Sequence, residues 1–156
     1  MKERIAANDD GALGELEAIE RWLKEGVRGD EIELLERYTA PRQTSPDFRV
    51  RGELVEVKTR NIALSKRYIS DQILAANNQI KSSGLAAGQR GAIEIQLKGE
   101  AARTAPLRDV ELQVDKAFER GENSSVRRVA VYGNGHLIGE WVRTVANAIV
   151  RIFPPG

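Results

Sequence analysis

The chain has 156 residues, 41% of them hydrophobic and 30% charged, which is typical of a single globular domain that can bury its own core. It has no cysteine, which excludes disulfides, thiolate metal sites and a cysteine nucleophile, while its net charge of +1 argues neither for nor against a nucleic-acid partner. No apolar run reaches membrane-spanning length and residues 1–10 lack the apolar segment of a signal peptide, so we expect no membrane partner. A free chain of this sequence would stay in the cytoplasm, whereas a domain excised from a longer polypeptide could be delivered elsewhere.

The first predicted element is an amphipathic helix that begins near Asp10 and ends at Gly26. Capping side chains precede it, and glycine commonly follows the end of a helix. Its apolar residues recur at helical spacing: Leu13, Leu16, Ile19 and Leu23. Glu15 and Glu17 lie in its early turns, where the helix dipole favours acids, so both are explained without any catalytic role.

The next segment, Glu31 to Tyr38, alternates in part and can be an edge strand or a short helix. We expect the strand, because Gly29 interrupts the preceding pattern. Thr39 to Pro46 is polar and holds two prolines, which predicts a loop.

Two short strands joined by a tight turn are predicted next. Phe48 and Val50 alternate with Arg49, the period-2 pattern of a half-buried strand. Arg51-Gly52 is typical of a hairpin turn, since glycine adopts the positive φ that such turns require. Glu53 to Thr59 then alternates again and forms the returning strand.

The hairpin brings together side chains that suit metal chemistry. Glu56 and Lys58 share one face of the returning strand, and Asp47, at the far end of the first strand, can approach both. Two carboxylates suit a hard cation such as Mg²⁺, which usually keeps several waters, and a lysine beside it can orient the attacking water. The alternative is a solvated charge pair on an exposed strand face, with Asp47 as a turn residue.

A second amphipathic helix is predicted from Leu64 to Ser83, with an apolar stripe formed by Ile69, Ile73, Ala76 and Ile80. Its polar side is rich in amides, including Gln79, which can bind phosphate, ribose or water, or can simply face solvent. The strand Ala92 to Leu97 alternates, so we expect an antiparallel or edge strand. Glu94 could reach the site if this strand lies beside Glu56, but we expect it to be exposed to solvent.

The C-terminal part predicts a third helix, two strands and a tail helix. The helix runs from Pro106 to Arg120, and the strands Val126–Tyr132 and His136–Val142 flank a Gly-Asn-Gly hairpin turn. His136 is the only histidine, so it lacks an imidazole partner for zinc and we expect a surface role. We expect Trp141 in the core and a short apolar helix over Val145–Phe153. The order α-β-β-β-α-β-α-β-β-α indicates an α/β fold with a mixed central sheet flanked by helices.

Pro46-Asp47 followed by Glu56-Val57-Lys58 resembles the PD-(D/E)XK nuclease superfamily, which has a restriction-endonuclease-like core. The wider layout is similar to toxin domains of contact-dependent growth inhibition systems, whose members of this fold include tRNA nucleases. The matching parts are Glu15 in the first helix, the PDFRVRG run at 46–52, Ala76-Asn77-Asn78-Gln79 and the strand Ala92–Leu97. The resemblance covers about residues 11–142 of a single domain spanning 1–156, and its motifs are short.

The resemblance implies a metal-dependent endonuclease, with tRNA as the favoured substrate. Asp47 and Glu56 would hold Mg²⁺ or Mn²⁺ with the Val57 carbonyl as a third ligand, Lys58 would assist the water, and Glu15, or Glu17 in its place, would complete the shell. Gln79 matches the family's A-x-x-Q position. A toxin of this kind would have a cognate immunity protein, and it could act in the cytoplasm of a target cell.

Two other functions stay open on the sequence. The chain keeps E-V-K followed by Thr59-Arg60, as DNA-cleaving relatives often do, so a repair, restriction or resolvase-type DNA nuclease is the first alternative. The second is a non-catalytic nucleic-acid-binding domain of the same fold. Basic residues are concentrated near the hairpin and favour phosphate contacts there: Arg42, Arg49, Arg51, Lys58, Arg60, Lys66 and Arg67.

Overall fold

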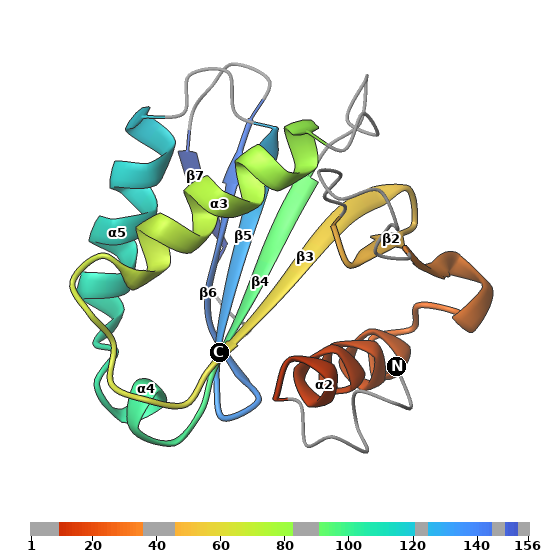
Figure 1. The fold of residues 1–156 in the computed structure, drawn as a ribbon, viewed down its shortest axis with the longest axis horizontal. Coiled ribbons are helices and arrows are strands. Elements are labelled where there is room, and N and C mark those ends of the chain that lie inside the picture. The colour runs from red at the N-terminus through yellow and green to blue at the C-terminus, as the bar shows by residue number, and fades with distance from the viewer. Residues whose placement is uncertain (1–9, 36–45, 83–90, 121–124, 145–148, 153–156) are drawn as a thin grey trace.

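The computed structural model describes residues 10–35, 46–82, 91–120, 125–144 and 149–152, and these form a seven-stranded sheet with helices on both faces (Figure 1). The strands, in spatial order, are β1 (Ile32–Leu34), β2 (Phe48–Val50), β3 (Glu53–Arg60), β4 (Gly91–Leu97), β5 (Val126–Gly133), β6 (His136–Arg143) and β7 (Ile149–Ile152). The helices are α2 (Asp10–Lys24), the 3-10 turn η1 (Gly29–Glu31), α3 (Tyr68–Ser82), α4 (Gly99–Arg103) and α5 (Leu107–Arg120). The predicted mixed α/β class is confirmed. Among these helices, none combines the length and the apolar character needed to cross a membrane.

The sheet is parallel at its centre and antiparallel towards both edges. β3, β4 and β5 run parallel, whereas the β1–β2, β2–β3, β5–β6 and β6–β7 pairs are antiparallel. Parallel neighbours need a crossover, and here α3 connects β3 to β4 while α4 and α5 connect β4 to β5. α3 and α5 cover the same face of the sheet (Figure 1), so this face holds the larger core.

The core on the α3 and α5 face follows the alternation of the central strands. Leu54 of β3 and Ile93 and Ile95 of β4 point to this face and are fully buried. They pack against the apolar stripe predicted for α3, Ile69, Ile73, Ala76 and Ile80, and against Val110, Val114 and Phe118 of α5. Trp141 of β6 joins the same cluster, as predicted.

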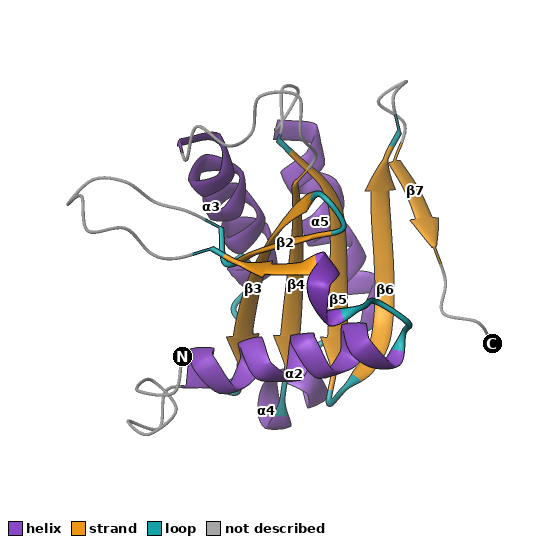
Figure 2. Ribbon diagram, turned by 90° about the vertical axis from the view of Figure 1, so that its right-hand side faces the viewer, coloured by secondary structure: helices purple, strands orange, loops and turns teal. Residues whose placement is uncertain are grey.

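The opposite face is covered by α2, which crosses the sheet near the C-terminal ends of β3 and β4 (Figure 2). Trp22 packs edge-on against Phe48, with ring centroids 5.2 Å apart. Gly14 permits the closest approach, because a Cβ there would lie 2.0 Å from Thr59 Oγ1. The Gln96 amide stabilises this contact, because its Nε2 donates hydrogen bonds to the Gly14 carbonyl at 2.8 Å and to Thr59 Oγ1 at 3.2 Å.

Three predictions about the fold are wrong, and each error has a physical cause. β4 was expected at an edge or in an antiparallel pair, but it is central, parallel to both neighbours and buried along its whole length. Glu94 was expected in solvent and is 2% exposed, because partners on α2 and β5 enclose it. The predicted tail helix over 145–153 contains β7, because a short apolar run fits a strand as well as a helix.

The predicted element order is therefore wrong at its last member, which is a strand. The short helix α4 was not predicted, and α3 begins at Tyr68 rather than at Leu64. The predicted strand after Gly29 is confirmed over Ile32–Leu34. The predicted loop at residues 39–45 lies outside the described part of the chain.

Candidate functional site

The β2–β3 hairpin sets the geometry of the proposed metal site. Both turn residues have positive φ, Arg51 at 49° and Gly52 at 83°, which is the conformation that matches the twist of a two-residue hairpin. The register pairs Phe48 with Val55. One residue further along, the register sets Asp47 opposite Glu56, so these two residues belong to the same face of the hairpin.

Asp47 is held at the end of this pairing by the backbone of β3. Its Oδ2 accepts a hydrogen bond of 2.9 Å from the Val57 N–H, and its side chain is buried. The N–H and C=O of a strand residue point to the same side of the strand, so the Val57 carbonyl lies on the same edge as the Asp47 carboxylate. The structure therefore brings together two of the three proposed metal ligands.

Glu56 is the third proposed ligand, and strand alternation places it with Lys58. Both alternate with Val55 and Val57, which pack under α2, so they point to the α3 side of the sheet. Glu56 is 1% exposed, whereas Lys58 is partly exposed. Lys58 takes part in no hydrogen bond or ion pair within the described residues.

Gln79 lies on the flank of α3 that faces β3. Two residues earlier, the Asn77 side chain accepts hydrogen bonds from the N–H groups of Ser125 and Val126, at the start of β5. Two residues correspond to about 200° around a helix, so Gln79 is on the other flank, towards β3. It is half-buried there, which agrees with a place beside the hairpin side chains.

Glu15 is buried at 4% exposure, but its helix covers the other face of the sheet. It belongs to the buried stripe of α2 that also carries Ala18 and Trp22 and packs on Val57. Glu56 and Lys58 point to the opposite face. The structure thus separates Glu15 from these two by the plane of the sheet. Glu17, the fallback choice, is exposed and forms an ion pair with Lys98.

No group of three or more His, Cys, Asp or Glu side chains arranged to hold a metal occurs in the part of the chain that is described. The candidate site instead offers two carboxylates and one main-chain carbonyl. Such a set leaves most of a cation's shell to water and to substrate oxygens, which is how Mg²⁺ is usually bound in phosphoryl-transfer sites.

The basic residues near the hairpin are less available to phosphate than their sequence suggests. Arg49 pairs with Glu33 at 2.7 Å and Arg51 pairs with Glu31 at 2.8 Å. Arg60 donates to the carbonyls of residues 62 and 63 and stacks on the Tyr68 ring. Arg42 lies outside the described residues. This leaves Lys58, Lys66 and Arg67 of the predicted cluster as cations that can meet a polyanion.

The sequence did not predict a buried charge network that lies on the α2 face of the sheet. Glu94 accepts hydrogen bonds from Arg21 at 2.5 Å, from Arg128 at 3.0 Å and from the Trp22 indole at 3.1 Å. Arg128 also binds Glu53 through its Nε and Nη2 atoms, at 3.0 and 2.7 Å. The available signal was an acid and an amide, Glu94 and Gln96, alternating with isoleucines in a strand bounded by glycine.

The network shifts the pKa values of its members in directions that follow from burial and charge. Burial acts to raise the pKa of Glu94, but Arg128 and Arg21 outweigh it and hold that pKa below its usual range. Burial, together with the Glu94 charge, raises the pKa of Tyr132 to about 12. Glu94 is therefore a charged carboxylate at neutral pH. The network is suited to holding α2 against the sheet and not to proton transfer.

Comparisons with protein-family models, curated proteins and solved structures find no match for this chain.

Proposed function

We propose that the chain is a metal-dependent nuclease that hydrolyses phosphodiester bonds at the β3 edge, which is the side of β3 beyond Val55 where pairing with β2 has ended. The observation that carries this proposal is the hydrogen bond between Asp47 and the Val57 N–H. It holds a buried carboxylate beside the Val57 carbonyl, on the hairpin face that also carries Glu56 and Lys58. Solvated charge pairs on an exposed strand, the alternative reading of the same residues, would not be buried to this extent.

The donor atoms fit a hard divalent cation. Asp47 and Glu56 would supply carboxylate oxygens and Val57 a carbonyl oxygen, and all three are ligands that Mg²⁺ and Mn²⁺ accept. When bound, the cation would polarise a phosphate and lower the pKa of a coordinated water. Both carboxylates are buried, and a bound cation would neutralise charge that is otherwise held away from water.

Lys58 would act on the water or on the phosphate. Its ammonium is partly exposed and makes no ion pair among the described residues, so it can orient an attacking water or offset charge that develops on the phosphate. Gln79, on the facing flank of α3, can hydrogen-bond the same water or a phosphate oxygen. Glu15 would act from the other side of the sheet as a positioning group rather than as a ligand.

The substrate we propose is tRNA, by resemblance to the growth-inhibition toxins, with a cognate immunity protein as partner. DNA is the competing substrate, because Glu56-Val57-Lys58 is followed by Thr59-Arg60 as in DNA-cleaving relatives. One assay separates them, in which purified chain is incubated with tRNA, single-stranded DNA and duplex DNA, each with Mg²⁺, Mn²⁺ or a chelator.

The test of the site uses matched variants. Lys58→Met removes the ammonium, and Lys81→Met makes the same change on an exposed turn of α3. We expect Lys58→Met to lower kcat by about a hundredfold or more, the usual contribution of a proton-transfer or charge-stabilising group. Lys81→Met should cleave like the wild type. Equal cleavage by both variants would remove Lys58 from the mechanism, whereas no cleavage by the wild type would favour a non-catalytic domain.

A further inference from the structure

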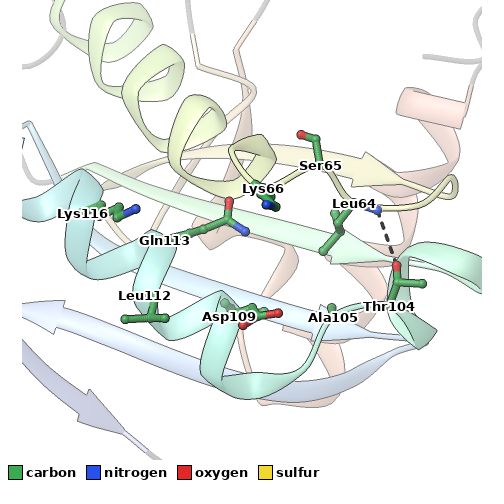
Figure 3. A pocket seen from close by; sticks show the side chains of 10 residues that line it. Leu64, Ser65, Lys66, Thr104, Ala105, Asp109, Leu112, Gln113 and Lys116 are labelled. Atoms are coloured by element: carbon green, nitrogen blue, oxygen red, sulfur yellow. Dashed lines mark hydrogen bonds between the residues drawn. The ribbon is translucent and has the colours of Figure 1, made fainter.

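A cavity lies away from the hairpin, between α5 and the loop that leads from β3 into α3. It has a volume of about 270 Å³. Figure 3 shows Leu64, Ser65 and Lys66 on the wall formed by the loop, and Asp109, Gln113 and Lys116 on the wall formed by α5. Thr104 joins the two walls, since its Oγ1 accepts a hydrogen bond from the Leu64 N–H at 3.4 Å.

Gln113 is the buried polar group of this cavity, at 8% exposure. Its Oε1 accepts hydrogen bonds from the N–H groups of Ile69 at 2.8 Å and Ser70 at 3.3 Å, and so caps the first turn of α3. Because the amide atom that accepts from both N–H groups must be the oxygen, the remaining amide atom of Gln113 is the nitrogen Nε2. This nitrogen points into the cavity (Figure 3) and donates to no group within the described residues.

Two lysines place positive charge at the mouth of the cavity. Lys66 and Lys116 are exposed, come from opposite walls, and take part in no ion pair in the described part of the chain. Asp109 is the acid among the lining residues. The cavity therefore offers one lysine from each wall, together with the Gln113 N–H donor and the Asp109 carboxylate from the α5 wall.

We propose that this cavity binds a phosphoryl group carried by a nucleotide, either free or within a polynucleotide. The ammonium groups of lysines bind phosphate oxygens as point charges, without a fixed bidentate geometry. The phosphoryl oxygens accept from Lys66, Lys116 and Gln113 Nε2. The Asp109 carboxylate repels the phosphoryl group from its own side and accepts a hydrogen bond from a ribose hydroxyl.

Gln113→Glu is the decisive variant, because it separates the two functions of this side chain. A carboxylate still accepts from the Ile69 and Ser70 N–H groups, and a negative charge suits a helix N-terminus, so the fold is kept. The same change replaces the N–H donor in the cavity with a negative acceptor. We expect it to weaken phosphoryl binding by more than about tenfold, the loss of a hydrogen bond to a charged group plus repulsion.

The experiment is calorimetric titration in a chelator, so that it does not depend on cleavage. The probes are inorganic phosphate, adenosine 5′-monophosphate and a short single-stranded oligonucleotide without terminal phosphates. Lys66→Gln and Lys116→Gln should each weaken binding by about tenfold, and Lys81→Gln is the matched control. Asp109→Asn should tighten binding of inorganic phosphate and reduce the advantage of the mononucleotide over it.

The titrations distinguish a free nucleotide from a polynucleotide as the ligand, and they can also overturn the proposal. Tighter binding of the mononucleotide than of the oligonucleotide identifies a free nucleotide as the ligand, and the reverse order identifies a polynucleotide phosphate. The proposal is overturned if the wild type binds none of the three probes saturably, or if Gln113→Glu binds them as the wild type does. Because no divalent cation is present, either result stands whether or not the hairpin site cleaves nucleic acid.

Discussion

Asp47 Oδ2 lies 2.9 Å from the main-chain nitrogen of Val57 and accepts a hydrogen bond from it. This hydrogen bond satisfies a β3 N–H group at the point where main-chain pairing with β2 has ended. β2 and β3 are paired only as far as Phe48 and Val55. The Asp47 carboxylate supplies the acceptor that a longer β2 would have supplied from its backbone. The same bond fixes the orientation of the carboxylate, so one residue has both a structural and a proposed catalytic role.

These two roles can be separated by two substitutions at position 47. Asp47→Asn keeps an oxygen that can accept from the Val57 N–H, so we expect unfolding within about 1 kcal/mol of the wild type but no metal-dependent cleavage. Asp47→Ala should also lose cleavage and cost about 1–3 kcal/mol, because the Val57 N–H is left without that acceptor. Thermal unfolding and nuclease assays on both proteins measure this. An active Asp47→Asn enzyme would contradict the metal-ligand role.

Binding of a cation should stabilise the folded chain even without substrate. A ligand that binds only the native state adds about 2.7 kcal/mol at a hundred times its Kd, so Mn²⁺ or Mg²⁺ should raise the melting temperature. Asp47→Asn and Glu56→Gln should abolish that rise, and Asp71→Asn, an exposed acid on α3, should leave it unchanged. A rise of the same size in all four proteins would show that the cation binds elsewhere.

The Glu94 network predicts a specific loss of stability in acid. Because the folded pKa of Glu94 is lowered from 4.5, the carboxylate stabilises the fold above pH 4.5, and that contribution is lost as the pH falls further, through the folded pKa. Glu94→Gln should lower the free energy of unfolding at pH 7 by about 3 kcal/mol, since Arg21 and Arg128 lose their buried counter-charge.

Glu94→Gln also tests whether Glu94 causes this loss of stability in acid. Urea unfolding at pH 7 and at pH 3.5 should show a smaller difference between the two pH values for Glu94→Gln than for the wild type. Glu119→Gln, on an exposed turn of α5, should keep the wild-type difference. An unchanged pH dependence in Glu94→Gln would mean that other carboxylates govern the acid transition.

Gly14→Ala tests how α2 is seated on the sheet. Alanine is intrinsically better than glycine in a helix by about 1 kcal/mol, but its Cβ would lie 2.0 Å from Thr59 Oγ1. We expect the clash to win and to destabilise the fold by about 1–3 kcal/mol. Thr59→Ala removes the clashing oxygen, so the double variant should be more stable than Gly14→Ala alone. Additive losses in this cycle would contradict the close contact.

The parts of the fold that could be predicted from the sequence are those governed by local pattern. The β2–β3 hairpin follows from Gly52 and the period-2 runs on either side, and α3 follows from a stripe of isoleucines. β4 was misplaced because Glu94 and Gln96 alternate with apolar residues, as on a solvated strand. Their partners, Arg21 and Gly14, lie more than 70 positions away along the chain. A local sequence pattern carries no information about contacts between residues so far apart.

The same limit applies to the candidate site. Sequence alternation correctly placed Glu56 and Lys58 on one face, because that depends only on the two-residue period of a strand. It did not place Glu15, because the side of the sheet that α2 covers is decided by packing of Trp22 and Ala18. It also missed Gln113, whose cap on α3 depends on how two helices lie side by side.

The most direct test of the nuclease proposal is a cleavage assay with the wild type and Asp47→Asn side by side. Purified proteins of matched thermal stability are incubated with tRNA and with duplex DNA, in Mn²⁺ or in chelator, and the products are resolved on a denaturing gel. We expect the wild type to cut one of these substrates only with the cation, and Asp47→Asn to cut neither. Wild-type protein that leaves both substrates intact in Mg²⁺ and Mn²⁺, or a variant that cuts equally well, would contradict a metal-dependent nuclease at the β3 edge.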